Sequence, residues 1–295
     1  MEKQVIKCPH CNNEKVIKRG YFQTNKNGKV QRYYCKNCNK KFIPKTAFYR
    51  MRNTPQKITL CLDLFYKGVS TRKLQDHLKA FYPHNSSHKS IYKWVIKYSN
   101  IIYDFTNKIP LKTGNELMVD EMEYSTKGKQ SWFVDCMDTR TRYMVSSEFM
   151  YGRKMENLVR VLKNAKKKTN NQIQIITTDG LMAYPQALHK SFLLHKIKSK
   201  NPIIHNIVKA NERGFNHKIE RLHNSIRERT KTFRSFHGSL NSASSIMKGM
   251  EVYYNFIRIH QAIKCRPFEL ATDLKLNSDN RWLELINKAN KGFLK

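Results

Sequence analysis

The chain of 295 residues has no long uninterrupted apolar run and no apolar segment close to its start. A membrane-spanning helix needs roughly 18 or more such residues, and a secretion signal needs an apolar segment near the N-terminus. Without a secretion signal we expect a reducing compartment, where cysteines stay as thiols or bind metal instead of forming disulfides. Little Ala with much Lys, Asn and Ile suggests an A·T-rich genome, hence the cytoplasm or nucleoid of a prokaryote.

Acidic residues are also scarce. The chain has 22 Asp and Glu against 56 Lys and Arg, a formal net charge of +34. Residues 1–113 hold only 5 of the acidic side chains but 24 of the basic ones. A charge of this size repels itself unless a polyanion neutralises it, so we expect nucleic acid, foremost double-stranded DNA, as the partner. An anionic membrane surface is the weaker alternative.

Four of the seven cysteines form two Cys-x-x-Cys pairs, Cys8 with Cys11 and Cys35 with Cys38. Two such pairs can surround one Zn²⁺ ion with four thiolates and leave no position open for a substrate, as in a structural zinc ribbon. Two disulfides are the alternative, but the cysteine total is odd and the other three have no regular spacing. We therefore predict a zinc ribbon over residues 1–45, containing a hairpin.

Three short helices are predicted between residues 50 and 105. Pro55 begins the first, Thr71 begins the second, and Ser86 or Ser87 caps the third. This order, with a basic amphipathic last helix, is typical of a helix-turn-helix DNA-binding domain. A plain three-helix linker bundle is the alternative. The polar face of the last helix carries three candidate DNA-binding residues: Lys89, Lys93 and Lys97.

Residues 114–262 alternate between short apolar strands and helices, which predicts an α/β domain. A strand from residue 116 ends in Asp120, and a later β-branched strand ends in Asp179. If these strands are neighbours the two aspartates converge, and Glu220 on a following helix could complete the site. Three clustered carboxylates would repel one another without a cation, and their hard oxygen atoms suit Mg²⁺ or Mn²⁺.

Other carboxylates compete for these positions. Glu121 follows the first aspartate directly, so on a strand it should point to the opposite face of the sheet. Asp138 fits a turn between two strands. Glu251, on the next helix, is the main alternative to Glu220.

The helix predicted around Glu220 is strongly basic. Its cations could follow the phosphates of bound DNA, or they form an ordinary solvated helix face. The histidines at positions 217 and 223 are expected on the helix surface; contact with a phosphate or the leaving hydroxyl is the alternative. The candidate phosphate-binding residues on this helix are Lys218, Arg221 and Arg227.

Several short motifs follow one another in a specific order through this part of the chain. They are Val119-Asp120-Glu121, Trp132-Phe133-Val134-Asp135, Arg153, Thr177-Thr178-Asp179-Gly180, Asn216 to Asn224, and Tyr254 to Ala262. Together they resemble the catalytic core of DDE insertion-sequence transposases, in the retroviral-integrase-like group of insertion-sequence family six. The interval from Asp179 to Glu220 is somewhat longer than is common in that group.

The resemblance implies an RNase H-like fold whose catalytic, Mg²⁺-binding triad falls on Asp120, Asp179 and Glu220, with Arg153 near the DNA. It also implies a transposase that binds terminal inverted repeats, cleaves 3′ ends, transfers strands, and works as a homo-oligomer on two DNA ends. A non-catalytic DNA-binding protein and a nuclease that cuts without joining are the alternatives. Residues 263–295 are predicted to form a tail with one weak helix.

Overall fold

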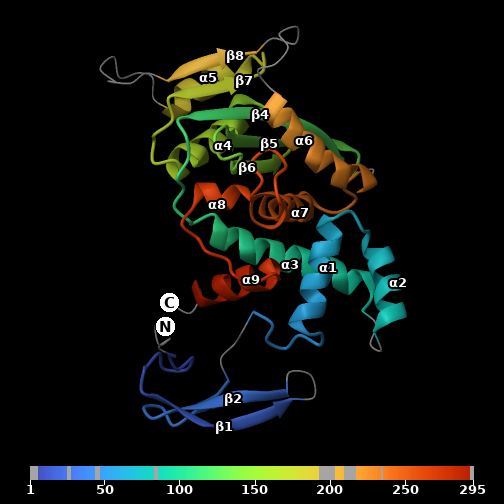
Figure 1. Cartoon of the computed structure of the whole chain (residues 1–295), viewed down its shortest axis with the longest axis vertical. Helices are drawn as coiled ribbons and strands as arrows, with labels where there is room; N and C mark the ends of the chain where they lie inside the picture. Colours follow the sequence, from blue (N-terminus) through green and yellow to red (C-terminus); the bar gives the residue numbers. More distant parts are fainter. Residues whose placement is uncertain are drawn as a thin grey trace.

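The computed structural model describes residues 6–24, 28–43, 47–82, 86–192, 203–208, 217–233 and 235–292. Figure 1 shows a small sheet at one end of the molecule, a layer of helices in the middle and a larger sheet at the other end. The small sheet contains β1 (Val16–Thr24), β2 (Gly28–Cys35) and β3 (Lys41–Phe42) in that order. Its first two strands form the predicted hairpin, whose predicted turn residues 25–27 lie outside the described residues.

The three predicted helices are present as α1 (Pro55–Tyr66), α2 (Thr71–Phe81) and α3 (His88–Thr106). Each begins where a hydroxyl side chain caps it: Thr54, Ser70 and Ser87 accept hydrogen bonds from backbone N–H groups of the first turn. Such caps satisfy helix N–H groups that otherwise have no partner. The cap residues in the sequence therefore predicted all three starting points.

The larger sheet has the strand order β6-β5-β4-β7-β8. Strands β4 (Glu116–Thr126), β5 (Lys129–Asp138) and β6 (Met144–Met150) are antiparallel neighbours, whereas β7 (Ile175–Thr178) and β8 (Ile204–Ile207) run parallel to β4. A three-stranded meander extended by two parallel strands beside its first strand is the RNase H-like arrangement. The α/β fold class predicted from the sequence is thus confirmed.

Two features of this sheet differ from the sequence prediction. Strand β4 does not end at Asp120 but continues to Thr126, because it pairs with β5 along its whole length. The turn that joins them is Lys127-Gly128, and both residues have positive φ, as a type I′ hairpin turn requires. Strand β8 was not predicted either, because only four residues form it and three of them are exposed.

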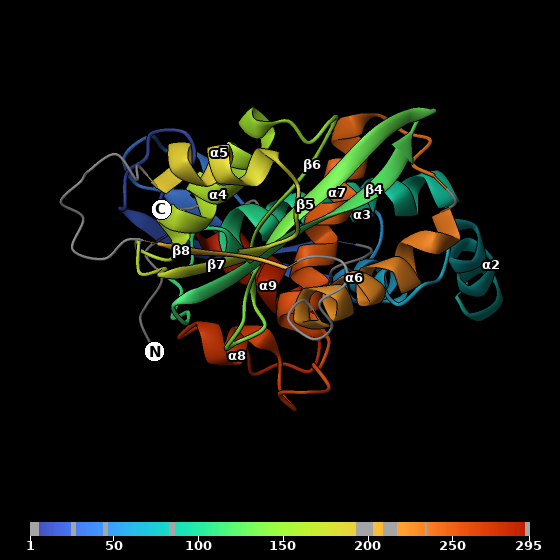
Figure 2. The same cartoon turned by 90° about the horizontal axis from the view of Figure 1, so that it is seen from above.

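Helices cover the sheet on both faces (Figures 1 and 2). Helices α4 (Met155–Lys168) and α5 (Ala183–Phe192) pack together on one face, and α6 (His217–Thr230) lies against β4 on the other. After a 3₁₀ turn, η1 (Lys231–Phe233), helix α7 (Leu240–Val252) runs into a π-helical turn, η2 (Tyr253–Ile257). The chain then forms α8 (Pro267–Ala271), which was not predicted, and α9 (Arg281–Gly292).

The helical layer is held together around the buried side chain of Tyr66. Its hydroxyl lies 2.8 Å from the Ser99 hydroxyl and donates to the Ile246 carbonyl, and its ring stacks on Trp282. These partners come from α3, α7 and α9, so one side chain of α1 joins four helices. Trp282 also donates to Asp63 of α1. The segment predicted as a tail therefore contributes a helix to the core.

A buried arginine joins this layer to the helix that covers the larger sheet. Arg229 of α6 is 3% exposed, and its guanidinium lies over the rings of Phe65 and Phe233, at 4.2 and 4.1 Å from their centroids. One of its nitrogens donates to Thr232. Within the described residues its Nε and Nη2 atoms have no hydrogen-bond partner.

None of the helices in the described part of the chain is long and apolar enough to cross a membrane.

A substitution at Gly249 can test how closely α7 packs against this helical layer. A Cβ atom at Gly249 would lie well inside contact distance of the hydroxyls of Tyr66 and Ser99. We expect Gly249→Ala to lower the free energy of unfolding by about 1–3 kcal/mol, although Ala favours a helix by about 1 kcal/mol over Gly. Urea unfolding measures the effect. Asn241→Ala, at an exposed position of the same helix, is the control, and a stabilised Gly249→Ala protein would contradict the packing.

Candidate active site

Two predicted catalytic residues meet where the parallel strands β4 and β7 lie side by side. Met118 of β4 pairs with Thr177 of β7, so Asp120 and Asp179, each two residues further on, lie next to each other. The side chain of Asp179 accepts a hydrogen bond from the backbone N–H of Leu181. Oxygen atoms of Asp120, Asp179 and Glu121 all lie within 4.8 Å of one another. The structure thus brings the two predicted aspartates together.

On the face covered by α6, Asp120 contacts a histidine. His223 Nδ1 lies 3.5 Å from Asp120 Oδ2, and His223 Nε2 lies 2.8 Å from Asp135 Oδ1. Asp120 and Asp135 are directly opposite each other in the β4–β5 ladder, which places their side chains on the same face. His223 is buried, so its predicted place on the helix surface is wrong. The helical period does reveal it, because Ile219, Leu222 and Ile226 share its face.

On the opposite face, Glu121 is held by two other side chains. Its carboxylate accepts hydrogen bonds from Arg153 at 2.5 Å and from the hydroxyl of Tyr184 on α5 at 2.6 Å. The Arg153 guanidinium also lies 4.0 Å from the Trp132 ring. Glu121 points to the opposite face, as its position after Asp120 predicted, yet one of its oxygens reaches the aspartate pair. Arg153 was predicted to contact DNA; here it neutralises this buried carboxylate.

Glu220 lies on the surface of α6, three residues before His223. Three residues of an α-helix span about 4.5 Å along its axis, so Glu220 is one turn away from a side chain that contacts Asp120. It is not among the three carboxylates that lie within 4.8 Å of one another in the described residues.

Glu251, the alternative to Glu220, is buried, accepts a hydrogen bond from Ser147 and lies 3.9 Å from Lys168. Asp138 accepts bonds from the turn that follows it, as predicted.

The electrostatics of the carboxylate group favour a bound cation. Burial raises the pKa of Asp120 to about 7, and the nearby charge of His223 only partly offsets this. Burial lowers the pKa of His223, but Asp135 and Asp120 outweigh that effect and the net shift is upward. A divalent ion would favour the ionised form of these carboxylates. The donor set is all oxygen, as Mg²⁺ or Mn²⁺ prefers, so the residues fit such an ion.

The four predicted zinc ligands also meet. Cys8 and Cys38 have sulfur atoms 3.5 Å apart, and so do Cys11 and Cys35. All four sulfurs lie within 4.8 Å of one another. Zinc–sulfur bonds of about 2.3 Å in a tetrahedron place the sulfurs about 3.8 Å apart, so this arrangement fits one Zn²⁺ ion. Among the described residues of the ribbon, the other packing is a small cluster around Cys8, Cys35 and Phe42.

The candidate DNA-binding lysines of α3 are exposed at positions one helical turn apart, so they form one row. Lys97 also lies near the carbonyl of Ala47 and the ring of Tyr98. On α6, Arg221 and Arg227 are exposed and Lys218 is partly buried. These positions leave the charges of the exposed side chains accessible to phosphate groups.

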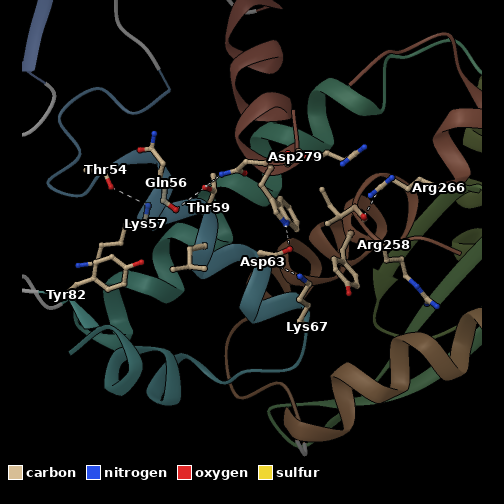
Figure 3. A pocket seen from close by; sticks show the side chains of 16 residues that line it. Thr54, Gln56, Lys57, Thr59, Asp63, Lys67, Tyr82, Arg258, Arg266 and Asp279 are labelled. Carbon is tan, nitrogen blue, oxygen red and sulfur yellow. Dashed lines mark hydrogen bonds and ion pairs between the residues drawn. The ribbon is translucent and has the colours of Figure 1, made fainter. Parts of the chain in front are cut away.

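A second basic feature was not predicted from the sequence. A cavity of about 530 Å³ lies between α1, η2 and the start of α9 (Figure 3). Asp63, in its wall, is already engaged by Lys67 and Trp282. No local motif indicates this cavity, because its wall joins segments that are more than 170 residues apart. Its basic lining residues are Lys57, Lys67, Arg258, Arg266 and Arg281.

An RNase H-like sheet with a carboxylate cluster on its central strands defines a class of metal-dependent enzymes that act on nucleic acid. The family model of the DDE domain, DDE_Tnp_IS240, matches residues 114–284. The chain therefore belongs to this DDE family, and it is a transposase-type enzyme with an integrase-like core. The matched residues include Asp120, Asp179 and Glu220. A comparison with curated proteins gives no match.

Solved retroviral proteins are also similar in structure. The magnesium-bound catalytic core domain of HTLV-2 integrase in a trimeric form is 13% identical, with a TM-score of 0.41, over 55% of this chain and 98% of that one. Its dimeric form is 13% identical, with a TM-score of 0.39, over 55% and 97%. The intasome of simian T-cell lymphotropic virus with the PP2A regulatory subunit B56 gamma is 11% identical, with a TM-score of 0.40, over 72% and 73%.

Zinc removal is expected to unfold the ribbon alone, because its small apolar cluster cannot hold it without the metal. We expect one Zn²⁺ per chain by colorimetric assay and rapid proteolysis of residues 1–45 after chelation, with the remaining helical circular dichroism intact. Cys35→Ser should lose the zinc. Cys265→Ser, which changes a cysteine outside the cluster, should retain it. Zinc bound at full occupancy in Cys35→Ser would contradict the assignment.

The raised pKa of Asp120 predicts a pH-dependent stability. Its pKa is about 7 in the folded protein and near its ordinary value of 3.8 when unfolded, so folding takes up a proton between these values and stability falls as pH rises. With EDTA at pH 8, Asp120→Asn should raise the free energy of unfolding, on the order of 1–3 kcal/mol. The difference should shrink at pH 5. Urea unfolding at both pH values measures it.

Glu123→Gln, on the exposed side of the same strand, should show no such change with pH. An Asp120→Asn effect of equal size at pH 5 and pH 8 would mean that the carboxylate is not the group that titrates.

Proposed function

We propose that the protein is a DNA transposase that binds the terminal inverted repeats of its own element, cleaves 3′ ends and transfers them to target DNA. The observation that carries this proposal is the adjacency of Asp120 and Asp179 on parallel strands, in a chain of the DDE family. The large positive charge supports a polyanionic substrate. We also propose the nucleoid of a prokaryotic cell as its place of action.

Asp120, Asp179 and Glu220 would hold the divalent ions of this reaction. Bound Mg²⁺ or Mn²⁺ would supply Lewis-acid stabilisation of the attacking and leaving oxygens. Glu220 belongs to this set in our proposal because its helix contacts Asp120 through His223. Its side chain is exposed on α6, three residues before His223. Arg221 and Arg227, on the same helix, would contact the DNA backbone, which fixes its position without reading sequence.

Recognition of the DNA ends would fall to the other parts of the chain. We propose that residues 1–45 and 50–105 act as a zinc ribbon and a helix-turn-helix domain ahead of a catalytic domain at 114–262. Lys89, Lys93 and Lys97 form an exposed row on the last helix of that second domain, where a recognition helix would face the DNA. Because an element has two ends, we further propose that at least two copies act together.

The test is a cleavage and joining assay on labelled element-end DNA with Mg²⁺ or Mn²⁺. Wild type should give joined products, and Asp179→Asn and Glu220→Gln should each reduce them by more than about 100-fold, since even partners of metal ligands are worth 10–100-fold. Glu123→Gln is the matched control and should stay active.

The other possible results of this assay would favour other functions or another active site. Tight binding with neither cutting nor joining would favour a DNA-binding protein without catalysis, and cutting without joining would indicate a nuclease. Full activity in Asp179→Asn would place the active site elsewhere.

A further inference from the structure

His223 and Asp135 form a buried pair that the proposed reaction does not use. His223 is 2% exposed and Asp135 is 0% exposed, and their contact measures 2.8 Å. Asp135 lies in the middle of β5, and its second carboxylate oxygen has no hydrogen-bond partner among the described residues. The pair therefore joins the centre of the sheet to α6.

Stability alone does not account for this pair. Burying a carboxylate and a ring nitrogen carries a desolvation cost, and apolar side chains of similar volume often replace such pairs without loss of stability. The neighbours of His223 on the buried face of α6 are apolar side chains such as Leu222 and Ile226. The polar pair calls for another explanation.

The pair holds Asp120 from one side. Asp120 Oδ1 accepts a hydrogen bond from the backbone N–H of Glu121 at 2.8 Å, and His223 Nδ1 lies 3.5 Å from Asp120 Oδ2. The carboxylate is thereby contacted at both oxygens. Because Asp135 contacts the other nitrogen of the same ring, it fixes the orientation of the imidazole. Second partners of this kind orient metal ligands in many proteins.

The same contact sets the position of α6. His223 is the polar residue through which this helix reaches both Asp120 and Asp135. Glu220 precedes it by one helical turn, so a rotation of α6 that broke these contacts would also displace Glu220.

We propose that His223, oriented by Asp135, is a positioning residue that fixes Asp120 and sets the rotation of α6 so that Glu220 reaches the aspartate pair. This inference rests on the proposed function, because it assumes that these three carboxylates bind a divalent ion. It assigns no direct contact with DNA to His223 or Asp135.

The test compares metal binding with stability in the full-length protein. His223→Phe keeps a ring of similar size but removes both nitrogens. We expect its affinity for Mn²⁺, measured without DNA by electron paramagnetic resonance, to fall about 10–100-fold. The midpoint of urea unfolding should also fall, because the buried Asp135 carboxylate loses its partner. DNA joining should fall at limiting Mn²⁺ and recover in large part at saturating Mn²⁺. Asp120→Asn should not recover.

Two further variants sharpen the comparison. Asp135→Asn should weaken Mn²⁺ binding in the same direction, and adding it to His223→Phe should cause little further loss, because the two residues act as a unit. The Asp135→Asn variant alone is the test if His223→Phe does not fold. Glu251→Gln, which changes another buried carboxylate bonded to Ser147, is the matched control. It should alter stability and leave Mn²⁺ affinity unchanged.

The outcomes separate this inference from the proposed function. If wild type neither binds Mn²⁺ nor cuts DNA, the proposed function fails and the inference fails with it. If wild type does both and Asp120→Asn does neither, but His223→Phe and Asp135→Asn bind Mn²⁺ as wild type does, the function stands and the positioning role is overturned. Weakened binding that higher Mn²⁺ overcomes supports the positioning role.

Discussion

The parallel pairing of β4 with β7 is the constraint on which the site depends. These strands are separated in the sequence by a hairpin, a third strand and a helix, and only their register places Asp120 beside Asp179. A shift of one residue in that register would turn one aspartate to the other face of the sheet. Buried side chains on both faces, Leu117 and Val119 on one and Met118 and Met122 on the other, make such a shift costly. The apolar core therefore fixes the positions of the two aspartates of the proposed active site.

The acidic side chains on the two faces of this sheet have different partners. On the α5 face, Glu121 has a cation and a hydroxyl close by and is nearly fully compensated. On the α6 face, Asp120 and Asp135 share one imidazole. The uncompensated negative charge is thus concentrated at Asp120 and its neighbour Asp179. This contrast marks one side of the sheet as the place for a cation, although acidic residues occur on both.

Much of this architecture could be predicted from the sequence, and the failures have physical causes. Cap residues such as Ser70 and the paired cysteines are local signals, and they identified the helices and the ribbon correctly. The end of β4 was misplaced because Glu121 and Glu123 interrupt its apolar pattern, while its pairing with β5 depends on contacts that a local pattern does not contain. His223 was misassigned although its helical position indicates burial, whereas its partner Asp135, 88 residues away, has no local signal. The proximity of Asp120 and Asp179 was predictable, whereas the group that surrounds them was not.

The contacts of Arg229 and Trp282 restrict where the chain can be cut into stable fragments. The guanidinium of Arg229 lies over the rings of Phe65 of α1 and Phe233, which follows α6. Trp282 near the C-terminus stacks on Tyr66 of the same α1. A fragment that ended after α3 would expose the rings of Phe65 and Tyr66 to water, and a fragment that began at β4 would leave the Arg229 guanidinium without the Phe65 ring. Truncation at residue 114 would therefore produce two fragments, each with an exposed apolar surface that the other fragment normally covers. Each fragment would tend to aggregate or to reassemble with the other in solution.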